Sequence, residues 1–176
     1  LAIAHAINRE ELSRARGPLL QVPGKSVIPS GYVGSDETTP IPAFDLAKSK
    51  QLLTEAGFPN GLQVRTIHTQ LPGMLSTIQV VQAQLKRAGI DLVIDLVDHQ
   101  TFHAQIRQNL SGIVHYSAAR FPVADIYLTQ FYHSSSIVQT PTAVTNFAHC
   151  KVADAEITAA RTEADPARQK ALWAQA

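Results

Sequence analysis

The chain has 176 residues, 45% of them hydrophobic, so it is long enough to enclose a hydrophobic core. Its 15 Lys and Arg residues against 14 Asp and Glu residues give a net charge of +1, which argues against a surface for nucleic acid or for an anionic membrane. The single cysteine excludes an internal disulfide, and no apolar run reaches the roughly 18 residues needed to cross a bilayer.

The N-terminal residues have apolar side chains at helical spacing. These are Leu1, Ile3, Ala4 and Ile7, and the pattern passes through Asn8 without a recognisable start signal, so we expect the chain to begin inside a helix. Proline and glycine then recur throughout residues 17–44, which leaves no room for a long helix or a central strand. That segment is expected to be a long ordered loop.

The middle of the chain alternates between helical and strand patterns. Asp45 is a suitable N-cap, whereas Gly57 and Gly89 each follow a helical pattern and can supply the left-handed residue that ends a helix. Two strands joined by a helix are expected to pair in parallel. The expected elements are helices over 45–56 and 74–88 and strands over 62–68 and 90–97.

The second half continues this alternation. The patterns predict helices over 98–108, 124–132 and 152–163, a last helix that starts at Asp165 and Pro166, and a short strand over 113–117. The fold class expected from the whole chain is α/β.

Several segments resemble the extracellular solute-binding proteins of family 5, the dipeptide, oligopeptide and nickel-binding receptors of ABC importers. Residues 44–61 resemble the family signature YDPEKAKQLLAEAGYPNG, residues 2–12 resemble ALAYAIDREEL, and residues 83–97 resemble QLKKAGIKVEIQ with its following strand. Further on, Asn146, Phe147 and Asp154 resemble the segment N…Y.NPEVD, and residues 165–176 resemble D..ERKALYAQA. The match runs in the same order over nearly the whole chain.

The resemblance implies one lobe of a two-lobe periplasmic-binding-protein-like fold, with βαβ units whose helices pack on a mixed sheet. Residues 1–176 would be a single α/β lobe, an incomplete C-terminal part of a longer receptor, with the 17–44 loop within it. The implied partners are a peptide-like or other small solute, an ABC permease and the missing N-terminal lobe. The implied location is periplasmic or extracytoplasmic, at the membrane through the transporter. No cofactor and no nucleic acid are expected.

Ligands of open α/β sheets bind beyond the carboxyl ends of the strands, and two loops meet that condition. The first loop follows the 62–68 strand, and the start of the next helix could offer backbone N–H groups to an anion. The second loop follows the strand expected at 113–117, and both loops should face one rim if the strands are parallel. The expected ligand-binding residues are His68, Thr69, Gln70, Tyr116, Ser117, Arg120 and Phe121.

Arg120 marks a departure from the family pattern. Peptide-binding relatives resemble GW.ADYPDP..FL here, and their Asp pairs with the ammonium group of the peptide, whereas this chain aligns Arg120 with that Asp and Ser117 with the Trp. A guanidinium repels an ammonium group and attracts a carboxylate or phosphate. The hypothesis is therefore an anionic solute; the alternative is a solvated Arg120, or one paired with Asp125.

Metal and enzyme hypotheses have less support. His99 and His103 share a helix face, but two histidines without a third ligand make a weak metal signal, and no metal site is expected. His68 and His115 lie at expected strand ends and are better candidates for ligand contact. No catalytic motif occurs, and Thr69 beside His68 is the one pairing of nucleophile and base in a predicted loop. We expect no enzyme; the alternatives are a regulator's effector domain of the same fold and, less favoured, a hydrolase.

Overall fold

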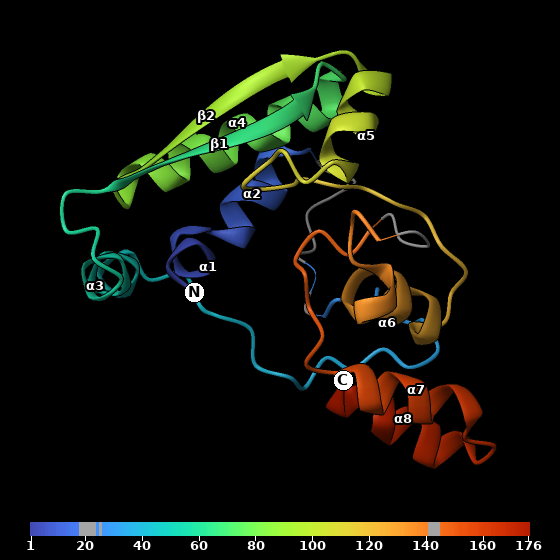
Figure 1. Ribbon diagram of the computed structural model, residues 1–176. Coiled ribbons are helices and arrows are strands. Elements are labelled where there is room, and N and C mark those ends of the chain that lie inside the picture. The colour runs from blue at the N-terminus through green and yellow to red at the C-terminus, as the bar shows by residue number, and fades with distance from the viewer. Residues whose placement is uncertain (18–23, 25, 141–144) are drawn as a thin grey trace. The chain divides into compact units, whose positions relative to one another are not determined.

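The computed structural model describes residues 1–17, 24, 26–140 and 145–176 (Figure 1). The chain divides into two compact units. The first unit comprises Leu1–Pro23, Pro42–Gln105 and Leu110–His115; the second comprises Gly24–Ile41, Ile106–Asn109 and Tyr116–Ala176. That residues 1–176 form a single lobe stays a prediction. None of the helices within the described residues is both long and apolar enough to span a membrane.

The first unit is built on a pair of strands, β1 (Leu62–Thr69) and β2 (Ile90–Val97), joined by α4 (Pro72–Arg87). The strands pair in parallel from Leu62 opposite Ile90 to Thr69 opposite Val97, and α4 runs along one face of the pair (Figure 1). This confirms the predicted βαβ unit. Among the described residues the sheet has these two strands alone, so the mixed sheet is not formed within this part of the chain.

Helix α3 (Leu46–Glu55) precedes the strands as predicted. The carboxylate of Asp45 accepts a hydrogen bond from Lys48 N–H at 2.9 Å, which caps the helix, and Gly57 follows it with φ of 90°. The backbone then turns at Gly61, whose φ is 96° and whose added Cβ would lie 2.5 Å from the Gly89 oxygen. That oxygen accepts from Leu62 N–H at 3.1 Å, so the turns before β1 and β2 touch each other.

The N-terminal segment forms two helices, α1 (Ala2–Ala6) and α2 (Arg9–Ala15). The expectation of one helix passing through Asn8 was wrong, because the Asn8 side chain accepts from Glu11 N–H at 3.0 Å and caps α2. An asparagine three residues before a glutamate is itself a start signal. The core of this unit consists of Ala6, Leu53, Ile78, Leu85, Ala88, Ile90 and Leu92.

Helix α5 (His99–Arg107) follows β2 and begins as predicted. The Asp98 side chain accepts from the N–H groups of Gln100 and Thr101, both at 3.0 Å, which caps the helix. Phe102 and Ile106 are buried as expected from their spacing.

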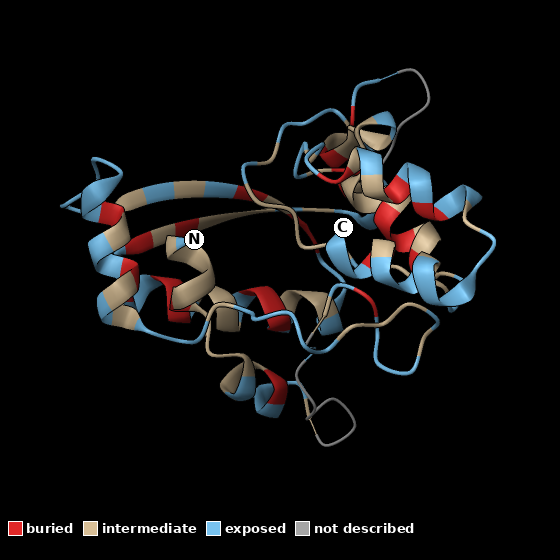
Figure 2. Cartoon of the chain, turned by 90° about the horizontal axis from the view of Figure 1, so that it is seen from below, coloured by how far each residue is buried: buried red, intermediate tan, exposed pale blue. Residues whose placement is uncertain are grey.

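The second unit contains α6 (Ala124–Tyr132), the short 3-10 helix η2 (Ser134–Ser136), α7 (Asp154–Thr162) and α8 (Pro166–Gln175). The three α-helices confirm the predictions, and their buried residues face away from the exposed ones (Figure 2). Trp173 packs so closely on Gly34 that an added Cβ there would lie 2.5 Å from its ring. The unit's core consists of Ile28, Ala124, Tyr127, Leu128, Ala153, Ile157, Ala160 and Trp173.

Two loop predictions have different outcomes. The described residues of the 17–44 segment contain no helix or strand, apart from a single bridge of Val33 to Val123, as expected of a loop; residues 18–23 and 25 lie outside the described residues. The strand predicted over 113–117 was wrong, because this stretch has no regular structure. Its Ile113 oxygen accepts from the Thr66 hydroxyl at 2.8 Å, so a side chain rather than a backbone ladder holds it beside β1.

Candidate functional site

The first group of candidate residues lies at the carboxyl ends of β1 and β2, beside the start of α5 (Figure 1). His68 and Thr69 are the completely buried last residues of β1, whereas Gln70 is exposed. These two side chains are buried because both sides of the strand pair are covered there. Helix α4 covers one face, and the 111–113 stretch is bonded to β1: Ile113 O accepts from Thr66, and the Ser111 hydroxyl accepts from Ile67 N–H. The side chains of His68 and Thr69 therefore do not reach solvent.

The neighbour that His68 contacts is His115. Nε2 of His68 lies 2.9 Å from Nδ1 of His115, and the two rings stack with centroids 5.2 Å apart. Nδ1 of His68 lies 2.9 Å from the Thr69 carbonyl oxygen, which can only accept, so this nitrogen carries the proton. In neutral His68 the lone pair is then on Nε2, and His115 Nδ1–H donates to it. Neutral His115 consequently has its own acceptor at Nε2.

The environment keeps both rings neutral. Burial lowers the pKa of His68, and the hydrogen bond to Thr69 offsets this only in part. Burial also lowers the pKa of His115, to about 4, with the positive charges of His68 and Arg16 as smaller causes. A neutral imidazole acceptor of this kind suits a ligand hydroxyl, amide or ammonium donor.

The first loop offers an anion fewer backbone donors than the sequence suggested. Gln70 N–H donates to Val97 O at 3.2 Å, Leu71 N–H to the Thr69 hydroxyl at 3.3 Å, and Met74 and Leu75 N–H to Leu71 O. Pro72, the first residue of α4, has no N–H. These contacts use most of the helix-start donors, so an anion there would have to compete with the protein's own oxygens.

The second group of candidate residues lies in the second unit, in the stretch before α6. Tyr116 packs on Phe147 with ring centroids 5.3 Å apart and on Phe131 at 6.1 Å. The guanidinium carbon of Arg120 lies 5.6 Å from the centre of the Phe131 ring. Ser117 and Phe121 are exposed, Phe121 by 76%, and Phe131 is the residue that brings Tyr116 and Arg120 together.

Arg120 is held in place by neutral groups. Its Nε–H donates to the Gln130 side-chain oxygen and its Nη1–H to the Ala119 carbonyl oxygen at 2.8 Å. Asp125 is 3.4 Å from Arg161 instead, so the expected alternative of an Arg120–Asp125 pair was wrong. A guanidinium has five N–H donors, and these contacts neutralise none of its charge. Arg120 is thus a positioned cation able to receive a carboxylate.

Sequence reasoning did not identify the contacts that hold the candidate residues in place. His115 was recognised as a possible contact, but its bond to His68 joins positions 47 apart, and no local pattern signals such a pair. Gln130 and Phe131 lie on α6, where their spacing indicates only a helix. His99 on α5 is a further neighbour of the buried Thr69. Its Nδ1 lies 3.1 Å from the Thr69 hydroxyl, and its spacing from His103 was visible in the sequence. No group of three or more His, Cys, Asp or Glu side chains among the described residues could hold a metal ion.

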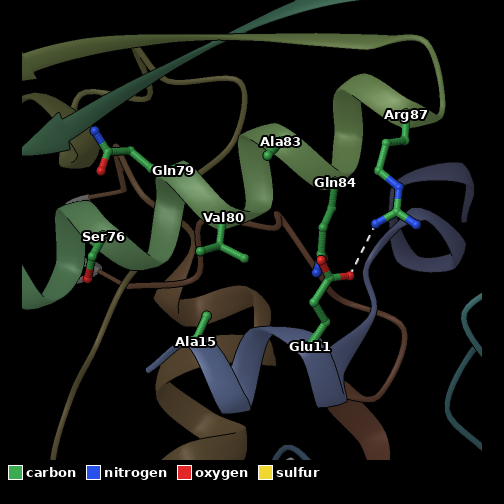
Figure 3. Close-up of a pocket in the computed structure, with 8 residues that line it drawn as sticks. All are labelled: Glu11, Ala15, Ser76, Gln79, Val80, Ala83, Gln84 and Arg87. Carbon is green, nitrogen blue, oxygen red and sulfur yellow. Dashed lines mark hydrogen bonds and ion pairs between the residues drawn. The ribbon is translucent and has the colours of Figure 1, made fainter. Parts of the chain in front are cut away.

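A separate groove of about 520 Å³ lies in the first unit between α2 and α4 (Figure 3). Arg87 and Glu11 form an ion pair across it at 3.1 Å, and the figure shows Val80 and Gln84 pointing from α4 toward α2 and Ala15 pointing back toward α4. None of the predicted ligand-binding residues lines it. Its residues are Glu11, Ala15, Ser76, Gln79, Val80, Ala83, Gln84 and Arg87.

Comparison with known proteins gives a consistent result. The sequence model of the bacterial extracellular solute-binding proteins, family 5 Middle, matches residues 1–139. The glutathione-binding protein GsiB of Salmonella choleraesuis is 28% identical over 183 residues, which cover 99% of this chain and 35% of GsiB. This chain thus spans about a third of the length of the relatives it matches.

Solved structures agree with this. The binding protein MoaA from A. tumefaciens R10, determined in complex with mannopinic acid, is 49% identical with a TM-score of 0.96, covering 99% of this chain and 35% of MoaA. The ABC transporter-associated periplasmic binding protein DppA from Helicobacter pylori, in complex with the peptide STSA, has a TM-score of 0.82 at 21% identity, over 99% of this chain and 34% of DppA. At that identity DppA shows the fold alone.

Proposed function

Since this chain belongs to the bacterial extracellular solute-binding proteins of family 5, we propose that it forms part of an ABC importer's substrate-binding component and that its solute is a small organic acid. The observation that carries this proposal is the 49% identity to MoaA, which binds an acid, over 99% of the chain. Arg120, held over Phe131 by neutral groups, supports it as a cation for the carboxylate.

The predicted ligand residues divide into two roles in this proposal. Arg120 pairs with the acidic group, and Tyr116, Ser117 and Phe121 flank it. Within the first unit, taken by itself, His68 and Thr69 fix His115 as a neutral acceptor that suits a hydroxyl or amine donor. Gln70 of the same unit has an exposed side chain that suits direct contact with a ligand.

The remaining proposals follow from the length of the relatives. The chain spans about a third of them, so we place it within a longer, two-lobed receptor that acts at the periplasmic face of the membrane with a permease. A closing second lobe would supply further contacts and exclude water. We assign no catalytic role, and the alternatives of a regulator's effector domain or a hydrolase have no observation in their favour.

Isothermal titration of the full-length receptor tests the choice of solute. The ligands are mannopinic acid, glutathione and a dipeptide with a free amino end. We expect mannopinic acid to bind most tightly of the three. Arg120→Gln should weaken its affinity about tenfold to a hundredfold, because a hydrogen bond to a charged group contributes about 1.5–3 kcal/mol. Arg168→Gln is the matched control, since Arg168 is exposed on α8. Tightest binding of the dipeptide, or equal losses in the two variants, would refute an acid held by Arg120.

A further inference from the structure

The two histidines of α5 face each other one helical turn apart. Nε2 of His99 lies 3.1 Å from Nε2 of His103, and the ring planes are inclined by 76°. Residues four apart on a helix share a face, so the backbone itself sets this spacing. His99 is exposed and His103 half-buried, which leaves the pair accessible within the first unit.

This separation is the one that a shared metal ion requires. Imidazole nitrogens bind first-row divalent ions at about 2.0–2.1 Å, so two of them at tetrahedral or octahedral angles lie about 2.9–3.4 Å apart. Without a metal the same two nitrogens share one proton in an N–H···N hydrogen bond. When an ion binds both Nε2 atoms, the hydrogen between them moves through solvent to Nδ1 of His103, so both rings stay neutral.

The surroundings of His99 are those of an oriented metal ligand. Its other ring nitrogen, Nδ1, lies 3.1 Å from the hydroxyl of Thr69, which is completely buried and also accepts from Leu71 N–H. When Nδ1–H donates to that hydroxyl, the lone pair of the ring is on Nε2 and points to the clamp. The buried Phe102 ring stacks on His99 at 18° and lies 5.3 Å from His103, so packing restrains both rings.

We propose that His99 and His103 form a two-histidine clamp for a divalent late first-row metal ion, with Cu²⁺ bound most tightly. Imidazole suits copper, nickel and zinc, and affinity rises along the series to Cu²⁺. The clamp supplies two protein ligands, and water fills the remaining positions. Among the described residues no third His, Cys, Asp or Glu side chain completes a group with this pair, so the protein supplies two ligands there.

The test is a titration of the untagged, metal-free full-length protein with Cu²⁺ alone, followed by calorimetry and by electron paramagnetic resonance. We expect one ion per chain with a spectrum of two equatorial nitrogens, and at least a tenfold loss of affinity in His103→Gln. His149→Asn is the control, because it removes an exposed imidazole from the second unit and Asn tolerates the left-handed backbone found there. Unchanged affinity in His103→Gln, or no binding at micromolar Cu²⁺, would overturn the proposal.

A second measurement needs no variant and so does not depend on one folding. Diethyl pyrocarbonate acylates accessible imidazole nitrogens, and mass spectrometry of the wild-type protein locates the product. Equimolar Cu²⁺ should slow the modification of His99 and His103 at least severalfold while leaving His149 unaffected. Equal rates with and without Cu²⁺ at the α5 pair would exclude the clamp.

Discussion

His68 and His115 share one proton between nitrogens that lie 2.9 Å apart, although 47 residues separate them in the sequence. Because the other nitrogen of His68 donates to the Thr69 carbonyl oxygen, the bond between the rings forms only when His68 is neutral. Protonation of His68 puts a second hydrogen between the two nitrogens, whereas protonation of His115 places a charge on a largely buried ring. The pair therefore links acid conditions to the stability of the first unit.

The first prediction concerns that link. The pKa of His115 falls from its ordinary 6.5 to about 4 on folding, so its contribution is fully present above pH 6.5 and is lost as the pH falls toward 4. Between pH 7.5 and pH 5 we expect a loss of about 1–2 kcal/mol in the free energy of unfolding, after allowance for the ring's partial exposure. His115→Asn, which keeps a donor toward His68, should remove this part of the loss. Urea denaturation at both pH values measures it, and equal losses in wild type and variant would contradict the assignment.

The second prediction concerns the touching turns before β1 and β2. A Cβ on Gly61 would lie 2.5 Å from the Gly89 oxygen, and the residue's φ of 96° is strained for any side chain. Gly61→Ala should therefore lower the free energy of unfolding by about 2–4 kcal/mol. Gly73→Ala is the matched control: nothing lies within 4 Å of its added Cβ, and alanine favours the helix by up to about 1 kcal/mol. A thermal melt of both variants gives the comparison, and similar midpoints would argue against the close contact.

Local signals predicted the helices well and the interactions between distant residues poorly. Asp45, Asp98 and Asp165 each cap the helix that their position predicted, because a cap is decided by three or four consecutive residues. The strand expected at 113–117 does not form; the Ile113 oxygen instead accepts from the Thr66 hydroxyl, and no periodicity reveals such a side-chain contact. Asn8 was read as helix interior although its own side chain starts α2.

The candidate site shows the same division. The general rule for α/β sheets places it after β1, and that location stays a prediction. That His68 and Thr69 would be buried did not follow, since their covering residues come from 111–113 and from α5. Arg120 was identified because it aligns with an Asp of the resembled family, whereas the Phe131 ring and Gln130 that position it lie ten or more residues away.

A third prediction concerns Gln84, which joins α4 to the start of α2. The side chain is 2% exposed; its oxygen accepts from Asn8 N–H at 3.1 Å and its amide donates to Asn8 O at 3.2 Å. Gln84→Met keeps the volume but leaves both Asn8 groups without these partners, so we expect a loss of about 1–3 kcal/mol. Gln79→Met, at an exposed position of the same helix, should change stability by less than about 0.5 kcal/mol. Equal free energies of unfolding in the two variants would show that the bonds to Asn8 contribute nothing.

The last prediction concerns Asn146, a completely buried side chain in the second unit. Its amide donates to His133 O at 3.0 Å and Cys150 O at 2.7 Å, and its oxygen accepts from Cys150 N–H at 3.1 Å. Asn146→Asp places a carboxylate oxygen against two carbonyl oxygens, which should cost at least about 3 kcal/mol near neutral pH. The new carboxyl would have a raised pKa, so the cost should shrink as the pH falls and the protonated group donates to one carbonyl. Denaturation at pH 7.5 and pH 4.5, with the exposed Asn60→Asp as control, measures this, and a pH-independent cost would contradict it.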